Sequence, residues 1–404
     1  MGKKCRKCVW IVNPFDNLPL EGYRPQRYWL MARAFAEKGH EVTYWTSDFS
    51  HATKQRRFFV QEANAGFAVR MVPTLAYPRN ICLKRVASHR RLARDWFALA
   101  NGESVKPDVV IASMPPLGLC DAARRFAVGC AAMFVADVQD AWPETFERIV
   151  PKWMLCTMRA KARRIYRNAD AISVVASRYI DLAKSYGATA PVKLSYNGID
   201  PGELSEVGDR SSRKESSSLQ LQLETPPLRL AYIGSFGASY DLETAIEAVR
   251  QTPNVTLDIA GSGPKEESLR EMAAGCERIR FHGYLAEAEM KALLRSCDVG
   301  LIPMFSESCV GVPGKLADYA AAGLRIVECL GGETRSLVER FHAGAHYEPC
   351  NVASLVAALN SPPCGDRDWA SFVATFDARR IMAEYVDWVE GLMCCRAVSV
   401  PTSN

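Results

Sequence analysis

The residues whose types and spacing are best suited to ligand binding or catalysis lie between positions 297 and 323. A short apolar run at 299–302 leads into a loop rich in Gly and Pro, and then into a helical segment that opens with Gly314-Lys315 and carries Asp318 one turn later. The first N–H groups of a helix are unpaired and carry partial positive charge, which suits a phosphate. A carboxylate in the next turn can accept hydrogen bonds from hydroxyl groups. The segment therefore predicts a site for a nucleotide sugar.

This segment resembles the donor-binding region of family 4 glycosyltransferases, which have two Rossmann-like domains in the arrangement called GT-B. The family usually carries two glutamates separated by seven residues here. In this chain Asp318 stands at the second position and Val310 stands eight residues earlier, with Glu307 as the nearest acid. Taken alone, the segment is also compatible with an ordinary strand–loop–helix crossover of a parallel α/β domain.

The resemblance implies a nucleoside diphosphate sugar as donor, with Lys315 pairing with its phosphates and Asp318 or Glu307 holding the sugar or ribose. A second strand, glycine loop and helix at 232–242 would lie near the phosphates, and the loop at 281–285 would contact the base. The predicted donor-binding residues are Gly22, Arg24, Gly234, Ser235, Gly237, Gly283, Tyr284, Leu285, Val312, Gly314, Lys315, Leu316 and Asp318.

A further acidic segment, at 137–144, directly follows a buried strand, so its side chains should lie at the carboxyl edge of a sheet, where open α/β sheets bind ligands. It is similar to an Asp-x-x-Asp-x-Trp-Pro segment in the bacterial polysaccharide and O-antigen branch of the family. Asp140 is expected to align an acceptor hydroxyl or to accept its proton, and Asp140 and Glu307 are the predicted catalytic carboxylates. The alternatives are a capping role for Asp140 and a core position for Trp142.

The whole chain alternates β-rich and helical segments, which predicts an α/β fold with two largely parallel sheets flanked by helices. Residues 202–227 are rich in Ser, Pro and charge and lack apolar periodicity, so they predict a linker. The predicted organisation is an N-terminal, acceptor-side Rossmann-like domain at 1–201, this linker, and a nucleotide-sugar-binding Rossmann-like domain at 228–375. The resemblance implies that a final helical segment at 376–404 crosses back onto the first domain. The predicted strands are 9–12, 41–46, 68–72, 109–112, 132–136, 171–175, 228–233, 255–260, 279–281, 299–302 and 325–328.

Composition and charge narrow the class of protein. The chain has 404 residues, of which 48% are hydrophobic and 24% charged, as in soluble globular proteins. No apolar run reaches the roughly 18 residues of a membrane-spanning helix. Residues 1–200 contain 31 Lys and Arg against 17 Asp and Glu, a net charge of +14, whereas the remainder contains 19 against 28, a net of −9. The first half is therefore expected to face an anionic partner.

One basic segment, at 152–167, carries apolar residues at helical spacing. It predicts either a core-facing helix with a solvated basic face or a helix that docks on an anionic membrane surface. The expected location is the cytoplasm, with peripheral attachment to the inner face of the cytoplasmic membrane as the sharper hypothesis.

The resemblance implies a retaining glycosyltransferase that moves a sugar to a glycan or to a polyprenyl-diphosphate-linked acceptor in cell-surface polysaccharide assembly. No nucleic acid partner, metal or cofactor is expected, because basic side chains and a helix terminus can neutralise the leaving diphosphate. Two alternatives share the fold: a nucleotide-sugar 2-epimerase, and a non-catalytic relative that binds a nucleotide sugar.

Overall fold

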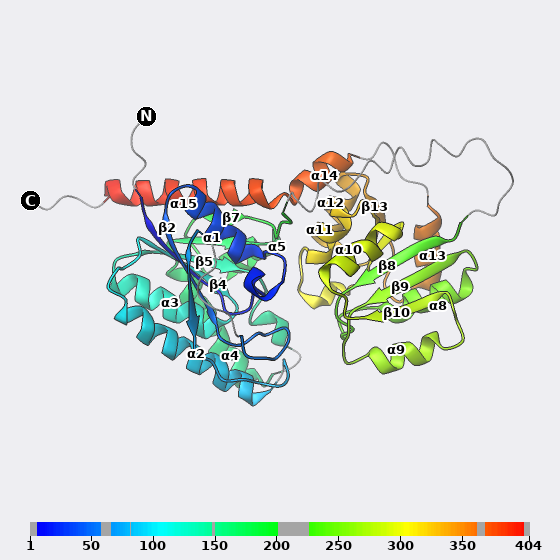
Figure 1. Cartoon of the computed structure of the whole chain (residues 1–404), viewed down its shortest axis with the longest axis horizontal. Helices are drawn as coiled ribbons and strands as arrows, with labels where there is room; N and C mark the ends of the chain where they lie inside the picture. Colours follow the sequence, from blue (N-terminus) through cyan, green and yellow to red (C-terminus); the bar gives the residue numbers. More distant parts are fainter. Residues whose placement is uncertain are drawn as a thin grey trace, which may run out of the picture. The chain divides into compact units, whose positions relative to one another are not determined.

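The computed structural model describes residues 6–57, 66–80, 82–147, 150–200, 226–361 and 368–399. The chain divides into two compact units (Figure 1). Unit 1 comprises Met1–Tyr196 and Ala378–Asn404, and unit 2 comprises Asn197–Asp377. Almost all of the predicted linker at 202–227 lies outside the described residues, which resume at residue 226.

Unit 1 is built on a seven-stranded sheet with the order β3-β2-β1-β4-β5-β6-β7, and every neighbouring pair runs parallel. The order reverses between β1 and β4, which is where open α/β sheets bind ligands. The strands are β1 (Cys8–Val12), β2 (Glu41–Ser47), β3 (Ala68–Val72), β4 (Val109–Met114), β5 (Met133–Val138), β6 (Ala171–Val174) and β7 (Val192–Leu194). The helices are α1 (Arg27–Glu37), α2 (Leu83–Gly102), α3 (Leu117–Gly129), α4 (Lys152–Arg167), α5 (Arg178–Ser185) and α15 (Ala378–Ser399).

Successive side chains of these strands point to opposite faces of the sheet, and both faces are covered by packed residues. Val9 and Ile11 of β1 belong to a core that includes residues of α1 and α15. Trp10, between them, contacts the rings of Trp45 and Phe126, with centroid distances of 5.3 and 5.1 Å. The central strands of unit 1, β1, β4, β5 and β6, are therefore buried on both sides, which explains their nearly continuous apolar sequence.

The last helix of the chain, α15, completes the core of unit 1. Tyr385, Val386 and Val389 are fully buried and cluster with Tyr28 and Phe35 of α1. Figure 1 shows α15 along one side of unit 1, next to α1. None of the helices in the described part of the chain is long and apolar enough to cross a membrane.

Unit 2 repeats the plan with a six-stranded parallel sheet in the order β10-β9-β8-β11-β12-β13. Its order reverses between β8 and β11. The strands are β8 (Leu228–Ile233), β9 (Val255–Ala260), β10 (Ile279–Gly283), β11 (Val299–Ile302), β12 (Arg325–Glu328) and β13 (Gly344–His346). The helices are α8 (Leu242–Gln251), α9 (Glu266–Ala273), α10 (Glu287–Ser296), α11 (Gly314–Ala321), α12 (Gly332–Arg340), α13 (Val352–Asn360) and α14 (Trp369–Thr375). The predicted fold class, two parallel sheets flanked by helices, is confirmed.

The basic helix α4 turns most of its apolar stripe inward. Leu155, Ala162, Ile165 and Tyr166 are buried, so these side chains serve the core of unit 1. Trp153, in contrast, is 68% exposed near the start of the helix. The core-facing interpretation is therefore right for the stripe.

Candidate functional site

The candidate donor site lies at the carboxyl edge of the unit 2 sheet, where the strand order reverses. The loop after β8 carries Gly234, and α11, which follows β11, begins with Gly314 and Lys315. The structure thus brings two segments that are about 80 residues apart in the sequence to the position where α/β sheets bind nucleotides.

Lys315 is the most unusual residue of this edge. It is only 9% exposed, and its ammonium makes no hydrogen bond to any described residue. The Nζ atom lies 4.1 Å from the ring centre of Tyr232 and 4.3 Å from that of Tyr240. Burial lowers the pKa of Lys315 to about 7, while Asp318 opposes the shift. This buried cation is stabilised by two aromatic faces and by the charge of Asp318, and it has no hydrogen-bond partner among the described residues, so it is preorganised to bind an anionic oxygen.

Gly234 lies directly beside this ammonium. Its φ of 142° is rarely adopted by residues with a side chain, and a Cβ placed there would approach Lys315 Nζ to 3.0 Å. The carbonyl of the next residue, Ser235, accepts a hydrogen bond from the Tyr232 hydroxyl at 2.6 Å. The glycine therefore keeps the space above the cation open, and the tyrosine is fixed by the same loop.

The position of α11 is set by Tyr319, one turn after Lys315. The Tyr319 hydroxyl donates to the carbonyl of Leu301 in β11 and accepts from the N–H of Ile233 in β8, both at 3.1 Å. Its ring lies on Gly300, where a Cβ would come within 2.4 Å of the ring. The start of the helix is thus held against both strands that flank the switch point.

The other residues predicted for the donor lie on loops of the same edge or on α11. Gly283, with a φ of 66°, ends β10, and Tyr284 beside it is 75% exposed. Glu307 is exposed in a 3-10 turn, Ser306–Ser308, and Asp318 is half-buried on α11. Among the remaining predicted residues, Ser235 and Gly314 are exposed, Gly237, Leu285 and Val312 are half-buried, and Leu316 is buried.

Gly22, Arg24 and Asp140 lie in unit 1. Gly22 ends the 3-10 turn Pro19–Glu21 with a φ of 82°, shortly before α1 begins. The Asp140 carboxylate accepts from the N–H of Ala141 at 2.8 Å, from Trp142 Nε1 at 3.2 Å and from Thr145 Oγ1 at 3.2 Å. These contacts are those of the capping alternative, and burial raises the pKa of Asp140. A role for Asp140 towards an acceptor stays a prediction.

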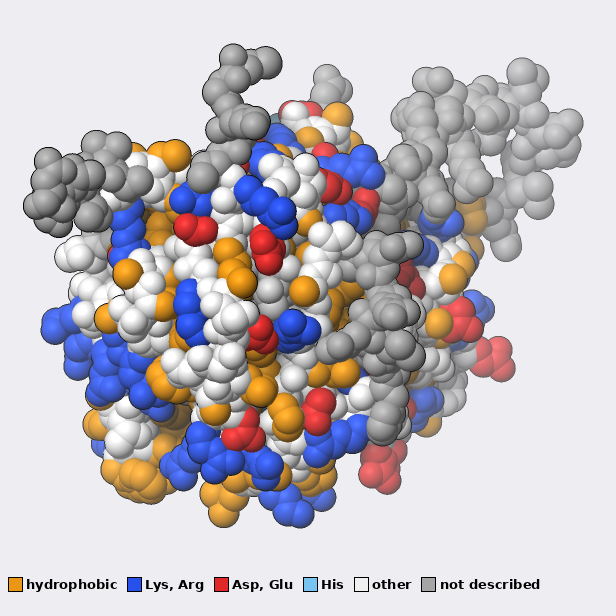
Figure 2. Space-filling view, turned by 60° about the vertical axis from the view of Figure 1, so that its left-hand side comes forward, with side chains coloured by type: hydrophobic (Ala, Val, Ile, Leu, Met, Phe, Trp, Pro, Cys, Tyr) orange, Lys and Arg blue, Asp and Glu red, His pale blue; other side chains and the backbone are white. Residues whose placement is uncertain are grey.

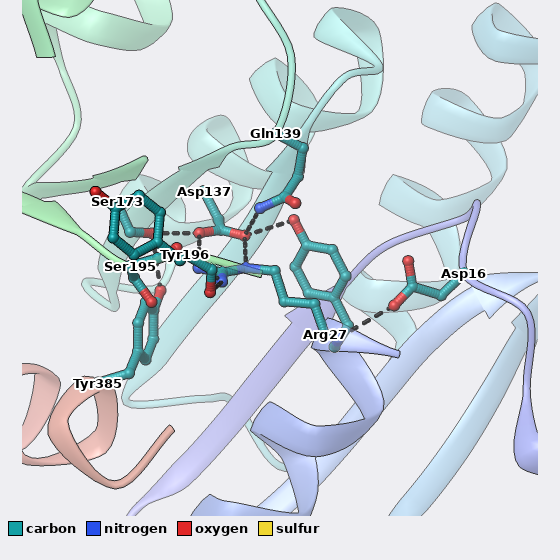
Figure 3. Close-up of polar contacts among 9 residues, drawn as sticks. Asp16, Arg27, Asp137, Gln139, Ser173, Ser195, Tyr196 and Tyr385 are labelled. Atoms are coloured by element: carbon teal, nitrogen blue, oxygen red, sulfur yellow. Dashed lines mark hydrogen bonds and ion pairs between the residues drawn. The ribbon is translucent and has the colours of Figure 1, made fainter. Parts of the chain in front are cut away.

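A buried network that was not predicted from the sequence is centred on Asp137, the residue before the end of β5 (Figure 3). Its carboxylate accepts from Arg27 Nε and Nη2 at 2.9 and 2.8 Å and from the Tyr28 hydroxyl at 2.6 Å. Burial alone would raise the pKa of Asp137, but the Arg27 guanidinium and the hydrogen bonds that the carboxylate accepts lower it below its usual value. Further hydrogen bonds come from Gln139 and Ser173, and Arg27 Nη1 donates to the carbonyls of Ser195 and Tyr196.

The Asp137 network fixes the position of the chain segments around it. Arg27 connects α1 to the end of β5 and to the last two residues of the first segment of unit 1. It therefore orients the start of the loop that carries Asp140. The only sequence signal for it was an arginine at the first position of a helix that otherwise begins with apolar residues.

Family models match both units. Residues 27–203 match a model described as Glycosyltransferase Family 4, and residues 228–361 match one described as Glycosyl transferases group 1. No curated protein matches the sequence.

Solved structures share the fold across nearly the whole chain. Sucrose-phosphate synthase from Thermosynechococcus elongatus is 14% identical, with a TM-score of 0.73 over 96% of this chain and 100% of that chain. Anabaena HepE in complex with UDP-glucose is 14% identical, with a TM-score of 0.64 over 96% and 100%. WaaG, a glycosyltransferase involved in lipopolysaccharide biosynthesis, is 16% identical, with a TM-score of 0.57 over 98% and 100%. The two family models cover the sheets of both units, and the chain belongs to the glycosyltransferases of the GT-B fold, with a family 4 region followed by a group 1 region.

Proposed function

We propose that this chain transfers a sugar from a nucleoside diphosphate sugar to a glycan or lipid-linked acceptor. The observation that carries the proposal is the Lys315 ammonium, which is buried at the start of α11 without a hydrogen-bond partner among the described residues. A diphosphate there would supply an anion both to a buried cation and to the unpaired N–H groups of a helix terminus. The complexes of HepE with UDP and UDP-glucose support a UDP-sugar as the first donor to test.

The residues at the carboxyl edge of the unit 2 sheet, together with Asp140 of unit 1, would each bind a different part of the substrates. Lys315 and the first N–H groups of α11 neutralise the diphosphate, and Gly234 leaves room for it. Asp318 or Glu307 holds the sugar or ribose, and the backbone of the loop around Tyr284 contacts the base. Asp140 in unit 1 orients the acceptor hydroxyl or takes its proton.

The reaction is proposed to need neither a metal nor a cofactor. The charge that develops on the leaving diphosphate would be stabilised by a preorganised cation and by helix amides, which cost no reorganisation during the reaction. We infer retention of anomeric configuration from the family resemblance.

The experiment that tests the function follows nucleotide release. Purified protein with UDP-glucose should release UDP slowly by hydrolysis and faster with an oligosaccharide or a polyprenyl-diphosphate sugar, and a chelator should leave the rate unchanged. Lys315→Ala should abolish release, whereas Lys291→Ala, which removes a half-buried lysine paired with Glu287 on α10, should not. Conversion of the donor to an epimer without UDP release would select the epimerase alternative, and binding without any turnover would select the non-catalytic one.

We propose that unit 1 attaches to an anionic membrane surface on the cytoplasmic side, where a lipid-linked acceptor would be presented. Leu83 and Trp153, on α2 and α4, are 82% and 68% exposed. Figure 2 shows Lys and Arg side chains gathered beside hydrophobic ones over the lower part of one face. Exposed apolar side chains among cations are typical of surfaces that bind anionic lipid headgroups. A cell-surface polysaccharide would then be assembled on a lipid carrier.

A further inference from the structure

A second group of chemically active residues lies at the carboxyl edge of the unit 1 sheet. It is centred on Tyr77, and its members come from the loops after β1, β2, β3 and β5 and from the first turns of α2. We call it the Tyr77 cluster; it comprises Phe15, His51, Lys54, Tyr77, Asn80, Arg85, His89 and Trp142. The Asp137 network is not part of it.

Two cations of the Tyr77 cluster share the same partners. Lys54 Nζ donates to Asn80 Oδ1 and Arg85 Nη1 to the Asn80 carbonyl, each at 2.6 Å. The same two groups lie over the Tyr77 ring, with Lys54 Nζ at 5.2 Å and Arg85 Cζ at 5.9 Å from its centre. Within the described part of the chain, neither Lys54 nor Arg85 forms an ion pair with a carboxylate within 4.0 Å. Two positive charges therefore lie next to the same ring and the same asparagine without an acidic counter-charge in contact.

The neighbouring groups do not supply that counter-charge. The His51 ring contacts the Tyr77 hydroxyl at 2.6 Å, and Arg85 Nε donates to His89 Nε2 at 3.4 Å. Burial, followed by the nearby cations, lowers the pKa of both imidazoles to about 3, so both rings are neutral at pH 7. Asp140 is the acid that acts on Arg85 electrostatically, but its oxygens already accept from three local donors.

We propose that the Tyr77 cluster binds a phosphate group carried by the acceptor, with Lys54 and Arg85 as its ligands. A phosphate monoester carries a charge of about −1.5 to −2 near pH 7, which matches two cations better than a single carboxylate does. The guanidinium fork can hold two phosphate oxygens, and the ammonium can hold the third. Phe15 and Trp142, both in contact with the Arg85 guanidinium, offer aromatic faces for the attached sugar.

This inference rests on the proposed transferase function, because it assigns the acceptor side of that reaction. The test is calorimetric titration of the full chain with glucose 6-phosphate, with UDP at saturation so that the Lys315 site is occupied. Glucose and glucuronic acid are the matched ligands. Lys54→Gln and Arg85→Gln should each weaken glucose 6-phosphate binding by about tenfold or more. Arg90→Gln, an exposed arginine on the same helix, should leave it unchanged.

Two further measurements distinguish phosphate binding by the Tyr77 cluster from a purely structural role of its residues. Removing one of two like charges should leave the melting temperature unchanged or raise it, whereas a purely structural cluster would lose stability. Binding of glucose 6-phosphate near pH 6 should release protons, because the two cations favour the dianion of a phosphate whose second pKa is about 6, and titration in buffers of different ionisation enthalpy detects this.

Failure of the phosphate-site inference can be distinguished from failure of the donor assignment. Equal binding of glucose and glucose 6-phosphate, or equal behaviour of Arg85→Gln and Arg90→Gln, overturns the inference even if UDP binds. Loss of UDP binding with phosphate binding intact overturns the donor assignment alone. If the inference holds, transfer assays with a hexose phosphate and with a short polyprenyl-diphosphate sugar identify the source of the phosphate, and Lys54→Gln should raise KM for whichever is used.

Discussion

Arg27 and Asp137 are separated by 110 residues in the sequence and form a bidentate ion pair, in which the two side chains are 4% and 0% exposed. Arg27→Ala leaves a buried carboxylate without its main partner, so we expect a loss of about 3–5 kcal/mol in the free energy of unfolding. Asp95→Ala, which breaks the pairs with the exposed residues Arg91 and Arg94, should cost less than about 1 kcal/mol. Urea unfolding of both variants checks this, and similar losses would show that the buried network contributes nothing special.

The low pKa of His51 and His89 predicts a pH dependence of stability. Both values are about 3 in the folded state and near 6.5 in the unfolded chain, so the folded state binds fewer protons between these limits. Stability should therefore fall as the pH drops from about 6.5 towards 3. Asp16 opposes this, since burial raises its pKa to about 6 and its protonation favours the folded state.

The two imidazoles and Asp137, whose pKa is lowered, act against Asp16 and Asp140, whose pKa values are raised. Because the pKa values of both imidazoles fall to about 3, the net expectation is lower stability at pH 5 than at pH 7. Chemical unfolding at both values measures it. His89→Gln should flatten the profile relative to the unaltered chain, and a profile that rises towards acid would contradict the assignment.

Donor binding should weaken at alkaline pH. Lys315 has a pKa of about 7 in the free protein, and a bound diphosphate raises it, so binding takes up a proton above pH 7. The affinity for UDP should fall with rising pH by up to about tenfold per unit in that window. Calorimetry at pH 6.5, 7.5 and 8.5 gives the slope. In Lys315→Arg, which stays protonated, the slope should vanish; an unchanged slope would assign it to another group.

Gly300→Ala should disturb the donor site from within the sheet. The added methyl would come within 2.4 Å of the Tyr319 ring, so the ring and α11 must shift. Overpacking of this kind costs about 1–3 kcal/mol. UDP affinity should drop in parallel, because the amides at the start of α11 move. Gly391→Ala, where nothing lies within 4 Å, is the matched control and should be neutral or stabilising.

Membrane attachment should depend on both charge and Trp153. Each Lys or Arg near an anionic surface contributes about 1 kcal/mol, and the attraction fades over a Debye length of about 10 Å at 0.1 M salt. The protein should co-sediment with vesicles of anionic lipid at low salt and dissociate at high salt. Arg163→Glu and Trp153→Ala should weaken sedimentation, while Met272→Ala, an exposed apolar residue of unit 2, should not. Equal sedimentation with neutral vesicles would refute the proposal.

The fold was largely predictable from the sequence because its strands are buried on both faces. In unit 2 the observed bounds of β8, β9, β11 and β12 are those expected from apolar runs. The strands that the sequence did not indicate are β7 and β13, at the edges of the two sheets. Both have three half-buried residues, so neither shows the apolar signal of a central strand.

The site was less predictable, for a physical reason. Lys315 stood out because a helix start is a local pattern, but its two tyrosines belong to β8 and to the loop before α8, about 80 residues earlier. Lys54 and Arg85 are drawn together only by the folding of separate loops on one sheet edge. Local spacing indicates what a segment can form, whereas the environment of a side chain depends on segments far away in sequence.

The return of α15 to unit 1 affects the order in which the protein can fold during synthesis. Tyr385, Val386 and Val389 fill the core around α1, so unit 1 lacks part of its interior until the final helix has left the ribosome. Every residue of unit 2 is synthesised before that helix, so unit 2 can become complete first although it comes later in the chain. The usual order, in which an N-terminal domain folds first, is therefore reversed at the last step. Until α15 arrives, the apolar face of α1 remains open to chaperones.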